Sequence, residues 1–465
     1  MTTATVARSV PDLAPFSPPG SPEYTAATTA YQLAEPVDPV AATTARSVED
    51  VVRAVATARR SGLPLRVSTT GHAAGRTGPL AGSLLLRPLI DGPVRVDPRT
   101  RTARVPAGRT WGEVLPEVLP HGLTALHGSS PTVGVVGYLL GGGVSFYGRR
   151  FGLAANAVRS LTVVLADGRV LEASADEHPD LFWALRGGGG GFGVVVEAQV
   201  DLVPVHAVVT GRAVWDVADA ARLAPLWQEW ARTAPPEIST SLRVLDLPPL
   251  PALPPSLAGR RALVLDGAVT ATTAGDLPAA QRTAEDLLAP LRALAEPVED
   301  TWAPAAPGAL AHVHLDPPDP AAFRSDTALV GELDDADWAG LFDAATGLVS
   351  LELRQLGGAI ADPPSAGGVV DRFAAPLLQY AVGPAGADTA SRLAAVREVL
   401  QPRLTGRTAP GFVDRPDQPQ RSYDDETRAR VEGVRLAVDP GGLFAGDVAP
   451  VRDRAAREEG VSGRG

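Results

Sequence analysis

The hydrophobic pattern of the chain is clearest between residues 47 and 62, where it predicts a helix. Ser47 is a suitable N-cap, acidic residues fill the first turn, apolar side chains recur every three or four positions, and Gly62 ends the pattern. The apolar run 63–67 that follows predicts a strand. This strand leads directly into Thr69-Thr70-Gly71-His72, so a histidine is expected in a loop of small residues at the end of a strand.

The remainder of the chain alternates between strand-like and helix-like segments. Apolar runs predict strands over 83–86, 94–96, 103–105, 161–165, 169–171, 194–203, 261–269, 348–353 and 377–382. Helical periodicity predicts helices over 218–233, 278–295, 387–400 and 425–437, and Thr110 and Glu113 form the capping box of one more. The glycine-rich character of the first part stops near Val205, which predicts a domain boundary there.

Composition excludes several classes of function. The 465 residues include 42 basic and 53 acidic side chains, a net charge of −11, without a dense basic run, which argues against nucleic acid as a partner. Cysteine is absent and every basic residue is arginine, so thiolate, iron–sulfur, Schiff-base and Walker-type lysine chemistry are excluded. The bias toward arginine, alanine, glycine and proline is typical of a GC-rich bacterial genome.

The chain has no apolar stretch of the roughly 18 residues that a membrane span needs. Its first twenty residues also lack the charged and apolar pattern of a signal peptide. We therefore expect a cytoplasmic protein without a membrane partner.

Three glycine clusters stand out, at 134–143, at 187–191 and at Gly193. Glycine lets the backbone approach a ligand closely and direct N–H donors at a phosphate. Five consecutive glycines match a dinucleotide fingerprint trivially, however, and a strand follows Gly193 where that fold needs a helix. Taken alone, the clusters are either structural turns or a cofactor cradle, and His72 is either a satisfied histidine in a turn or a residue held against a ligand.

Several spaced motifs, taken in order, resemble one family. They are the Gly71-His72 loop, HGSSPTVGVVGYLLGGG (His127 to Gly143), RFGLAAN (Arg150 to Asn156), DLFWALRGGG (Asp180 to Gly189), LELRQLGGA (Leu351 to Ala359) and DPGGLF (Asp439 to Phe444). The chain thereby resembles the berberine-bridge-enzyme-like FAD-linked oxidases of the vanillyl-alcohol-oxidase superfamily, whose FAD-binding domain is of the p-cresol methylhydroxylase type. The resemblance covers residues from about 35 to 205 and from about 410 to 450.

This resemblance implies an α+β flavoprotein of two domains. Residues 1–206 and a returning C-terminal segment, 407–465, would form the FAD-binding domain. Residues 207–406 would form an inserted substrate-binding domain, an antiparallel sheet covered by helices. The flavin would lie at the junction with its ring facing this sheet.

The resemblance also implies the residues that hold FAD. His72 matches the histidine that relatives bond to the flavin 8α-methyl group, and Ser130 stands where many relatives place a second, cysteinyl bond, so one bond through His72, or none, is implied. Tyr138 matches a side chain at the pyrimidine edge of the flavin, with a core tyrosine as the alternative. The full implied set is Ser68, Thr69, Thr70, Gly71, His72, Ala73, Ser129, Ser130, Val133, Gly134, Gly137, Tyr138, Gly141, Gly142, Gly143, Asn156, Gly193, Val194 and Val195.

Relatives use a tyrosine or a carboxylate to take the substrate proton while hydride passes to flavin N5. Strand alternation puts Gln355 on the opposite face from Glu352 and Arg354, and we take Gln355 as a candidate substrate contact. Tyr380 and Tyr423 are the candidate bases, each with a purely structural role as the alternative. No metal site is expected, because the alternating pair of histidines at 312 and 314 has no supporting carboxylate arrangement.

The expected function is FAD-dependent oxidation of a small alcohol, amine or phenolic natural product in biosynthesis or catabolism, with oxygen reoxidising the flavin. Gly191, Gln355, Asp371 and the pair Asp447-Val448 depart from the family, whose members often have asparagine or histidine there. These departures keep two alternatives open, a non-oxidative cyclase or dehydratase that retains FAD as a scaffold, and a flavin-binding protein without turnover.

Overall fold

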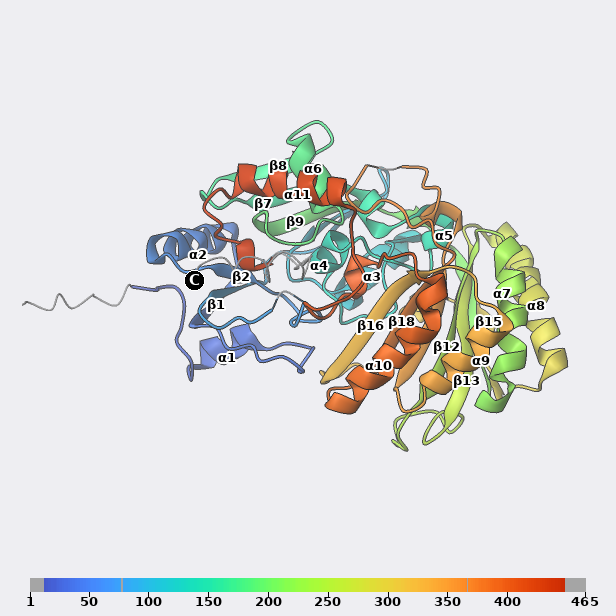
Figure 1. Cartoon of the computed structure of the whole chain (residues 1–465). Helices are drawn as coiled ribbons and strands as arrows, with labels where there is room; N and C mark the ends of the chain where they lie inside the picture. The colour runs from blue at the N-terminus through green and yellow to red at the C-terminus, as the bar shows by residue number, and fades with distance from the viewer. Residues whose placement is uncertain (1–11, 77, 366, 448–465) are drawn as a thin grey trace, which may run out of the picture.

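The computed structural model describes residues 12–447 except residues 77 and 366. Figure 1 shows an N-terminal unit of small sheets and helices on one side of the molecule and a large sheet, with helices along one face, on the other. The last α-helix, α11 (Asp425–Val438), returns to the N-terminal unit and packs near α6 (Pro179–Leu185), the helix that follows strand β8 (Val170–Ser174).

Two sheets organise the N-terminal unit. A parallel sheet has the order β1-β3-β2, and an antiparallel sheet has the order β4-β5-β9-β7-β8. Their other strands are β1 (Ala41–Ala45), β2 (Leu65–Val67), β3 (Leu84–Pro88), β4 (Arg95–Asp97), β5 (Thr102–Pro106), β7 (Val158–Val164) and β9 (Val194–Asp201). A short pair, β6 (Leu123–Thr124) with β10 (Val203–Pro204), lies close to the point where the chain leaves this unit.

The helices of this unit are α1 (Pro22–Thr28), α2 (Val48–Ser61), α3 (Trp111–Val118), α4 (Val135–Leu140), α5 (Gly148–Phe151), α6 (Pro179–Leu185) and α11 (Asp425–Val438). Two helices of this unit, α2 and α3, begin at the caps read from the sequence, Ser47 and Thr110. The helix predicted between residues 47 and 62 is confirmed, because Ser47 caps α2 reciprocally with Asp50 and Gly62 ends it with a φ of 71°. The buried face of α2 packs against β1 and β3, which fixes the neighbouring strand β2 and the loop that follows it.

The middle unit is one antiparallel sheet of eight strands. Its order is β14-β11-β13-β12-β17-β18-β16, with β15 also paired to β11. The strands are β11 (Ala207–Asp216), β12 (Ile238–Asp246), β13 (Arg261–Ala271), β14 (Glu299–Asp300), β15 (Ala303–Ala305), β16 (Phe323–Val330), β17 (Ser350–Gln355) and β18 (Leu377–Pro384). The helices are α7 (Ala220–Thr233), α8 (Leu277–Leu294), α9 (Asp335–Ala344) and α10 (Ala387–Leu400).

The two faces of this sheet differ in chemistry. One face buries Leu242, Leu353 and Ala381 in a core shared with the helices α7 to α10, visible beside the sheet in Figure 1. The other face carries the charged side chains Asp266 and Glu352. The N-terminal unit covers this face, where the Phe146 ring packs against His314 and Arg354. Strand alternation therefore separates a structural face from a face that meets the N-terminal unit.

Candidate functional site

The histidine loop of residues 68–73 follows β2 directly. Ser68 N–H still bonds to Leu86 of β3 at 3.1 Å, after which the chain leaves the sheet. Gly71 has a φ of 73°, and a Cβ at this position would lie 2.6 Å from Ala30 Cα and Cβ. Tyr31 N–H donates to the Thr70 carbonyl at 3.0 Å. The loop is thus locked against a preceding segment, and that close approach requires glycine.

His72 is held by two neighbours from distant parts of the chain. Its Nε2 lies 3.0 Å from Thr132 Oγ1, which is also 3.0 Å from Ser130 Oγ. The ring of Tyr31 stacks on the imidazole, with centroids 3.8 Å apart and an angle of 14° between the planes. Burial lowers the pKa of His72 to about 4, against the smaller opposing effects of Thr132 and Asp316, so the imidazole is neutral at physiological pH.

Two loops present backbone donors that the chain itself does not use. Within the described residues, the N–H groups of 69–73 and of 128–130 donate to no acceptor of the protein. The loops touch, because a Cβ on Gly134 would lie 3.0 Å from Thr69 Oγ1 and 3.4 Å from Thr70. Converging free N–H groups suit an anionic pyrophosphate, so the residues present fit FAD.

Tyr138 lies on α4 beside these loops. Its ring packs close to Gly128 and Gly143, and it meets Trp111 edge-on with centroids 5.4 Å apart. Its buried hydroxyl has no hydrogen-bond partner among the described residues, and burial raises its pKa. A satisfied core tyrosine would have a partner. The unpartnered hydroxyl therefore fits the contact to a flavin edge that the resemblance implies.

Several other residues that the resemblance assigns to the cofactor also have contacts within the protein that explain their presence. A Cβ on Gly141 would meet the backbone of Gly411 at 2.9 Å, and one on Gly193 would meet the Val164 carbonyl at 2.6 Å. Asn156 donates through Nδ2 to the Asp371 carbonyl at 2.8 Å. The remaining implied residues are Val133 before α4, Gly137 within it, Gly142 and Gly143 after it, and the buried Val194 and Val195 at the start of β9.

A buried ion network crosses the polar face of the middle sheet. His314 Nδ1 lies 3.1 Å from Asp266 Oδ1 on β13, and its Nε2 lies 3.3 Å from Glu352 Oε2 on β17. Glu352 also accepts from Arg354 Nε at 2.6 Å, and Asp266 pairs with Arg243 on β12. The sequence suggested no carboxylates near this histidine, and that expectation was wrong because they come from strands distant in sequence.

The network holds His314 and Glu352 in charged form. Burial and Arg243 lower the pKa of His314, but Asp266 and Glu352 outweigh them and raise it to about 9. Burial alone would raise the pKa of Glu352, yet Arg354 and His314 hold it well below its usual range. Both ring nitrogens of His314 face carboxylates, and the described residues contain no cluster arranged as a metal site. His314 is therefore a buried cation that pairs with both carboxylates.

Tyr380 lies on this polar face, at the register position opposite Glu352. Its ring meets Phe412 edge-on at 5.2 Å, and the guanidinium of Arg354 lies over the same Phe412 ring at 5.5 Å. Asp414 is buried nearby, where its Oδ2 accepts the Ser325 N–H at 3.0 Å while Oδ1 has no partner among the described residues. Burial raises the pKa of Asp414 to about 6, and burial together with Asp414 raises that of Tyr380.

The face assigned to Gln355 was wrong. The predicted alternation holds, but Gln355 points toward the helices, where Oε1 accepts from Thr240 at 3.0 Å and Nε2 donates to the Ala231 carbonyl at 3.0 Å. Glu352 and Arg354 occupy the face that meets the N-terminal unit instead. The periodicity showed that the two faces differ, but it did not show which of them the helices cover.

Tyr423 precedes α11, and its hydroxyl donates to the Gly187 carbonyl at 2.7 Å. This bond holds the glycine loop in place. It therefore gives Tyr423 a structural role, which is the alternative to its role as a candidate base. Asp447, one of the departures, is buried against Arg66 with Nε 3.0 Å from Oδ1. Its neighbour Val448 lies outside the described residues.

Sequence reasoning did not single out Tyr31, Thr132, Asp316 or Asp414. Asp316 accepts from Ser129 Oγ at 2.7 Å and thereby joins the loop after His314 to the second donor loop. Thr132 lies inside a quoted motif and could have been found as a hydroxyl beside Ser130. The other three have no local signal, because they are brought to the site only by tertiary packing.

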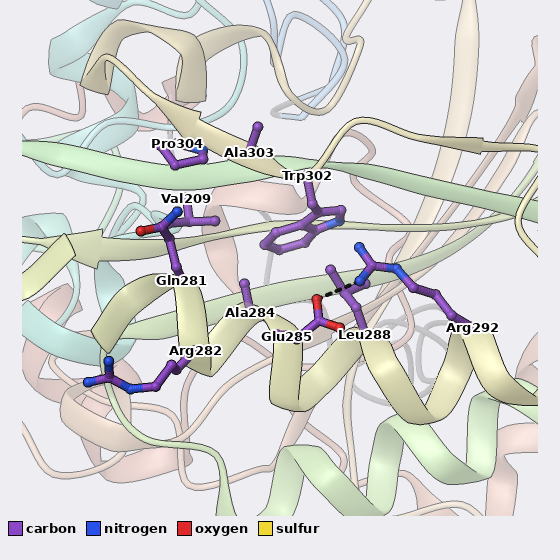
Figure 2. A pocket seen from close by; sticks show the side chains of 10 residues that line it. All are labelled: Val209, Gln281, Arg282, Ala284, Glu285, Leu288, Arg292, Trp302, Ala303 and Pro304. Carbon is purple, nitrogen blue, oxygen red and sulfur yellow. Dashed lines mark hydrogen bonds and ion pairs between the residues drawn. The ribbon is translucent and has the colours of Figure 1, made fainter. Parts of the chain in front are cut away.

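A groove of about 350 Å³ lies elsewhere, between α8 and the strands β11 and β15. Figure 2 shows Trp302 and Val209 on its sheet side and the Glu285–Arg292 ion pair along the helix. None of the predicted site residues lines it. This groove is therefore separate from the site around His72.

Comparison with known proteins shows which family part of the chain is similar to. Residues 39–174 match the FAD binding domain family. Glucooligosaccharide oxidase of Sarocladium strictum is 35% identical over 46% of this chain and 44% of its own length. (R)-6-hydroxynicotine oxidase of Paenarthrobacter nicotinovorans is 35% identical over 36% of this chain and 37% of its own. The chain thus matches less than half the length of these curated relatives.

The fold extends over nearly the whole chain. The structure of a variant of berberine-bridge-enzyme-like protein 1 from Physcomitrella patens superimposes with a TM-score of 0.79 at 21% identity, covering 94% of this chain and 97% of that one. The resemblance inferred from the motifs is confirmed. The chain matches the FAD binding domain family over residues 39–174 and has the α+β fold of the berberine-bridge-enzyme-like proteins. In the part that the structure describes, no helix is both long and apolar enough to cross a bilayer.

Proposed function

We propose that the protein is an FAD-dependent oxidase of a small organic alcohol or amine. The observation that carries this proposal is the convergence of two loops with unused N–H donors, around a neutral histidine, beside the polar face of the middle sheet. The matching FAD binding domain supports the choice of cofactor. Bound FAD would accept hydride from the substrate at N5 and pass the electron pair to dioxygen, giving hydrogen peroxide.

The residues implied by the resemblance would hold the cofactor in three parts. Backbone at 68–73 and 129–134 would bind the pyrophosphate and the ribityl chain through the free N–H groups. The Tyr138 hydroxyl would face the pyrimidine edge, where its high pKa keeps it a neutral donor. His72 would bond covalently to the flavin, and Ser130 permits no second bond because a serine hydroxyl is far less nucleophilic than a thiolate.

The substrate would lie between the flavin and the polar face of the sheet. Tyr380 would hydrogen-bond to the reacting hydroxyl or amine, and Asp414, with its raised pKa of about 6, would receive the proton. Arg354 is held over the rings of Phe146 and Phe412, at 5.1 Å and 5.5 Å, and would close the far side of the site. The named relatives oxidise an oligosaccharide and a hydroxynicotine, which supports hydroxyl- and amine-bearing compounds as the first candidates.

The test is anaerobic mixing of the purified yellow protein with candidate alcohols and amines. Loss of the flavin colour on mixing, followed by its return and by hydrogen peroxide when air is admitted, is the expected result. Product formed without bleaching would indicate the non-oxidative alternative. A protein that stays colourless after FAD is added would contradict the proposal entirely.

A further inference from the structure

Arg354 is a buried arginine on the polar face of β17, and only 5% of its surface is exposed. Its Nε donates to Glu352 Oε1 at 2.6 Å, and its Nη2 lies 3.3 Å from His314 Nε2. Within the described residues, Nη1 has no hydrogen-bond partner. Because a guanidinium carries five N–H donors, Arg354 keeps unused donors in a place with little access to water.

The buried cluster around Arg354 contains more cations than carboxylates. Its members are at most 5% exposed; the cations are Arg243, His314 and Arg354, and the carboxylates are Asp266 and Glu352. His314 is protonated, so its contact with Arg354 Nη2 brings two donors together, and neither of them can accept. A buried charge without a partner is costly, so the cluster favours one further negative charge.

Two further carboxylates lie near the cluster, but neither of them pairs with Arg354. Asp316 is only partly buried and accepts from Ser129 Oγ at 2.7 Å, and its charge acts on Arg354 from beyond ion-pair distance. Asp414 is buried, but the cation that acts on it is Arg415. Among the described residues, no other carboxylate forms an ion pair with Arg354 besides Glu352. An anion from outside the chain would therefore complete the cluster.

Arg354 lies close to the candidate base Tyr380. The Cζ of Arg354 is 5.1 Å from the centroid of the Phe146 ring and 5.5 Å from that of Phe412. Tyr380 meets the same Phe412 ring edge-on and is the register partner of Glu352, two residues before Arg354. Arg354 and Tyr380 are therefore diagonal neighbours on one face of the sheet, a relationship that places backbones roughly 7–8 Å apart. One small molecule can reach both side chains.

We propose that the substrate carries a carboxylate, which binds the free Nη1 of Arg354 while the reacting hydroxyl or amine meets Tyr380. This inference rests on the proposed function and narrows its substrate class to hydroxy acids and amino acids. The carboxylate supplies the negative charge that the buried cluster lacks, and it accepts a charge-assisted hydrogen bond from the guanidinium. A neutral substrate of the same shape would leave the additional positive charge uncompensated, so it would bind more weakly.

The experiment measures binding and not turnover. Benzoate and benzamide are matched probes, because they share a ring and differ in charge, and each is titrated into the FAD-loaded protein at neutral pH while the flavin absorption spectrum is followed. We expect benzoate to bind at least about tenfold more tightly than benzamide, because the carboxylate forms a hydrogen bond between charged groups.

Variants of Arg354 assign this preference to its guanidinium. Arg354→Gln should remove the preference, whereas Arg354→Lys, which keeps the charge but loses the planar fork, should bind benzoate several-fold more weakly than wild type. Arg430→Gln is the matched control and should behave like wild type. Arg430 also lies over an aromatic ring, that of Trp183, but its side chain is 54% exposed.

Three results would overturn the anion site at Arg354. Equal affinity of wild type for benzoate and benzamide does so without any variant. A preference that survives in Arg354→Gln does so as well, and a lowered midpoint potential of the flavin in that variant would then assign the guanidinium to the cofactor. If Arg354→Gln does not fold, wild-type affinity for benzoate in Arg354→Lys is the contradictory result.

Anaerobic mixing with hydroxy and amino acids separates this inference from the proposed function. A preference for benzoate without any acid that bleaches the flavin would support the anion site and overturn the proposed oxidation. An acid and its amide that bleach the flavin with equal kcat/KM would support the oxidation and overturn the anion site. A protein that binds no FAD would overturn both.

Discussion

His314 and Glu352 face each other across the polar side of the middle sheet, with Nε2 3.3 Å from Oε2 and both side chains about 95% buried. His314 comes from the loop after the short 3-10 helix Pro307–His312, and Glu352 comes from β17. Because Asp266 meets the second ring nitrogen at 3.1 Å, the imidazole joins two strands that are not adjacent. A histidine so placed is a structural cation, and it couples the stability of the middle unit to pH.

Stability should decline as pH rises from 6.5 to 9. The pKa of His314 is raised from 6.5 to about 9 in the folded protein, so the folded state binds the proton more tightly than the unfolded state. The stabilisation that the His314 proton provides is complete below pH 6.5 and is lost as the pH passes through 9. Its contribution to the free energy of unfolding is at most on the order of 3 kcal/mol. Urea unfolding at a series of pH values checks this. His314→Gln should flatten the decline and the exposed control His121→Gln should not, so parallel curves for wild type and His314→Gln would contradict the prediction.

Gln355 and Glu352 should respond differently to substitution because they lie on opposite faces of β17. Gln355→Leu leaves the Ala231 carbonyl without its donor, which should lower the free energy of unfolding by about 1–3 kcal/mol with kcat/KM within twofold of wild type. Glu352→Gln removes the negative charge that pairs with Arg354 and His314, which should lower the free energy of unfolding by about 3–5 kcal/mol. Chemical denaturation and steady-state kinetics on the same preparations check both. A large rise in KM for Gln355→Leu would restore it as a substrate contact.

The strength of each local signal decided how much of the fold was predictable. The helices at 387–400 and 425–437 were found almost to the residue, and at the second of them the Asp424 side chain caps the helix by accepting the Thr427 N–H. The strands β11, β12 and β16 were missed. They are buried on both faces and mix polar with apolar residues, so neither alternation nor a continuous apolar run marks them. The antiparallel order of the sheet depends on pairings between distant segments and has no signal in any one of them.

The site divides in the same way. One side of the candidate site could be predicted because His72, Ser130 and Tyr138 lie in motifs that resemble one family. The opposite side could not, because Asp316 and Asp414 lie in loops and reach it only through contacts with Ser129 and Ser325. Gln355 shows the remaining difficulty. Periodicity separates the two faces of a strand, but helices contributed by other segments decide which face is inside.

Gly71 should be required for FAD binding in a way that other left-handed glycines are not. Gly71 and Gly62 have nearly equal φ angles, +73° and +71°, so alanine costs each about 1–2 kcal/mol of backbone strain. A Cβ at Gly71 also meets Ala30 at 2.6 Å, whereas nothing lies within 4 Å at Gly62. Gly71→Ala should therefore lose at least tenfold in FAD affinity, and Gly62→Ala should keep it. Flavin content and fluorescence titration with FAD provide the measurement, and equal affinities would show that the loop does not hold the cofactor.

Tyr380 and Asp414 should act together on the substrate proton. Asp414 has a raised pKa of about 6, so it is a carboxylate able to accept a proton only above that pH, and the rate should rise with pH through about 6. Tyr380→Phe should lower kcat by roughly 100-fold or more because the substrate loses its hydroxyl partner. Asp414→Asn should lower kcat similarly and should abolish the rise of the rate with pH near 6. Tyr380→Phe should retain this rise. Anaerobic stopped-flow reduction of the flavin across a pH series separates the two effects. An unchanged rise in Asp414→Asn would assign it to another group, and an undiminished rate of flavin reduction in Tyr380→Phe would remove this tyrosine from the chemical step.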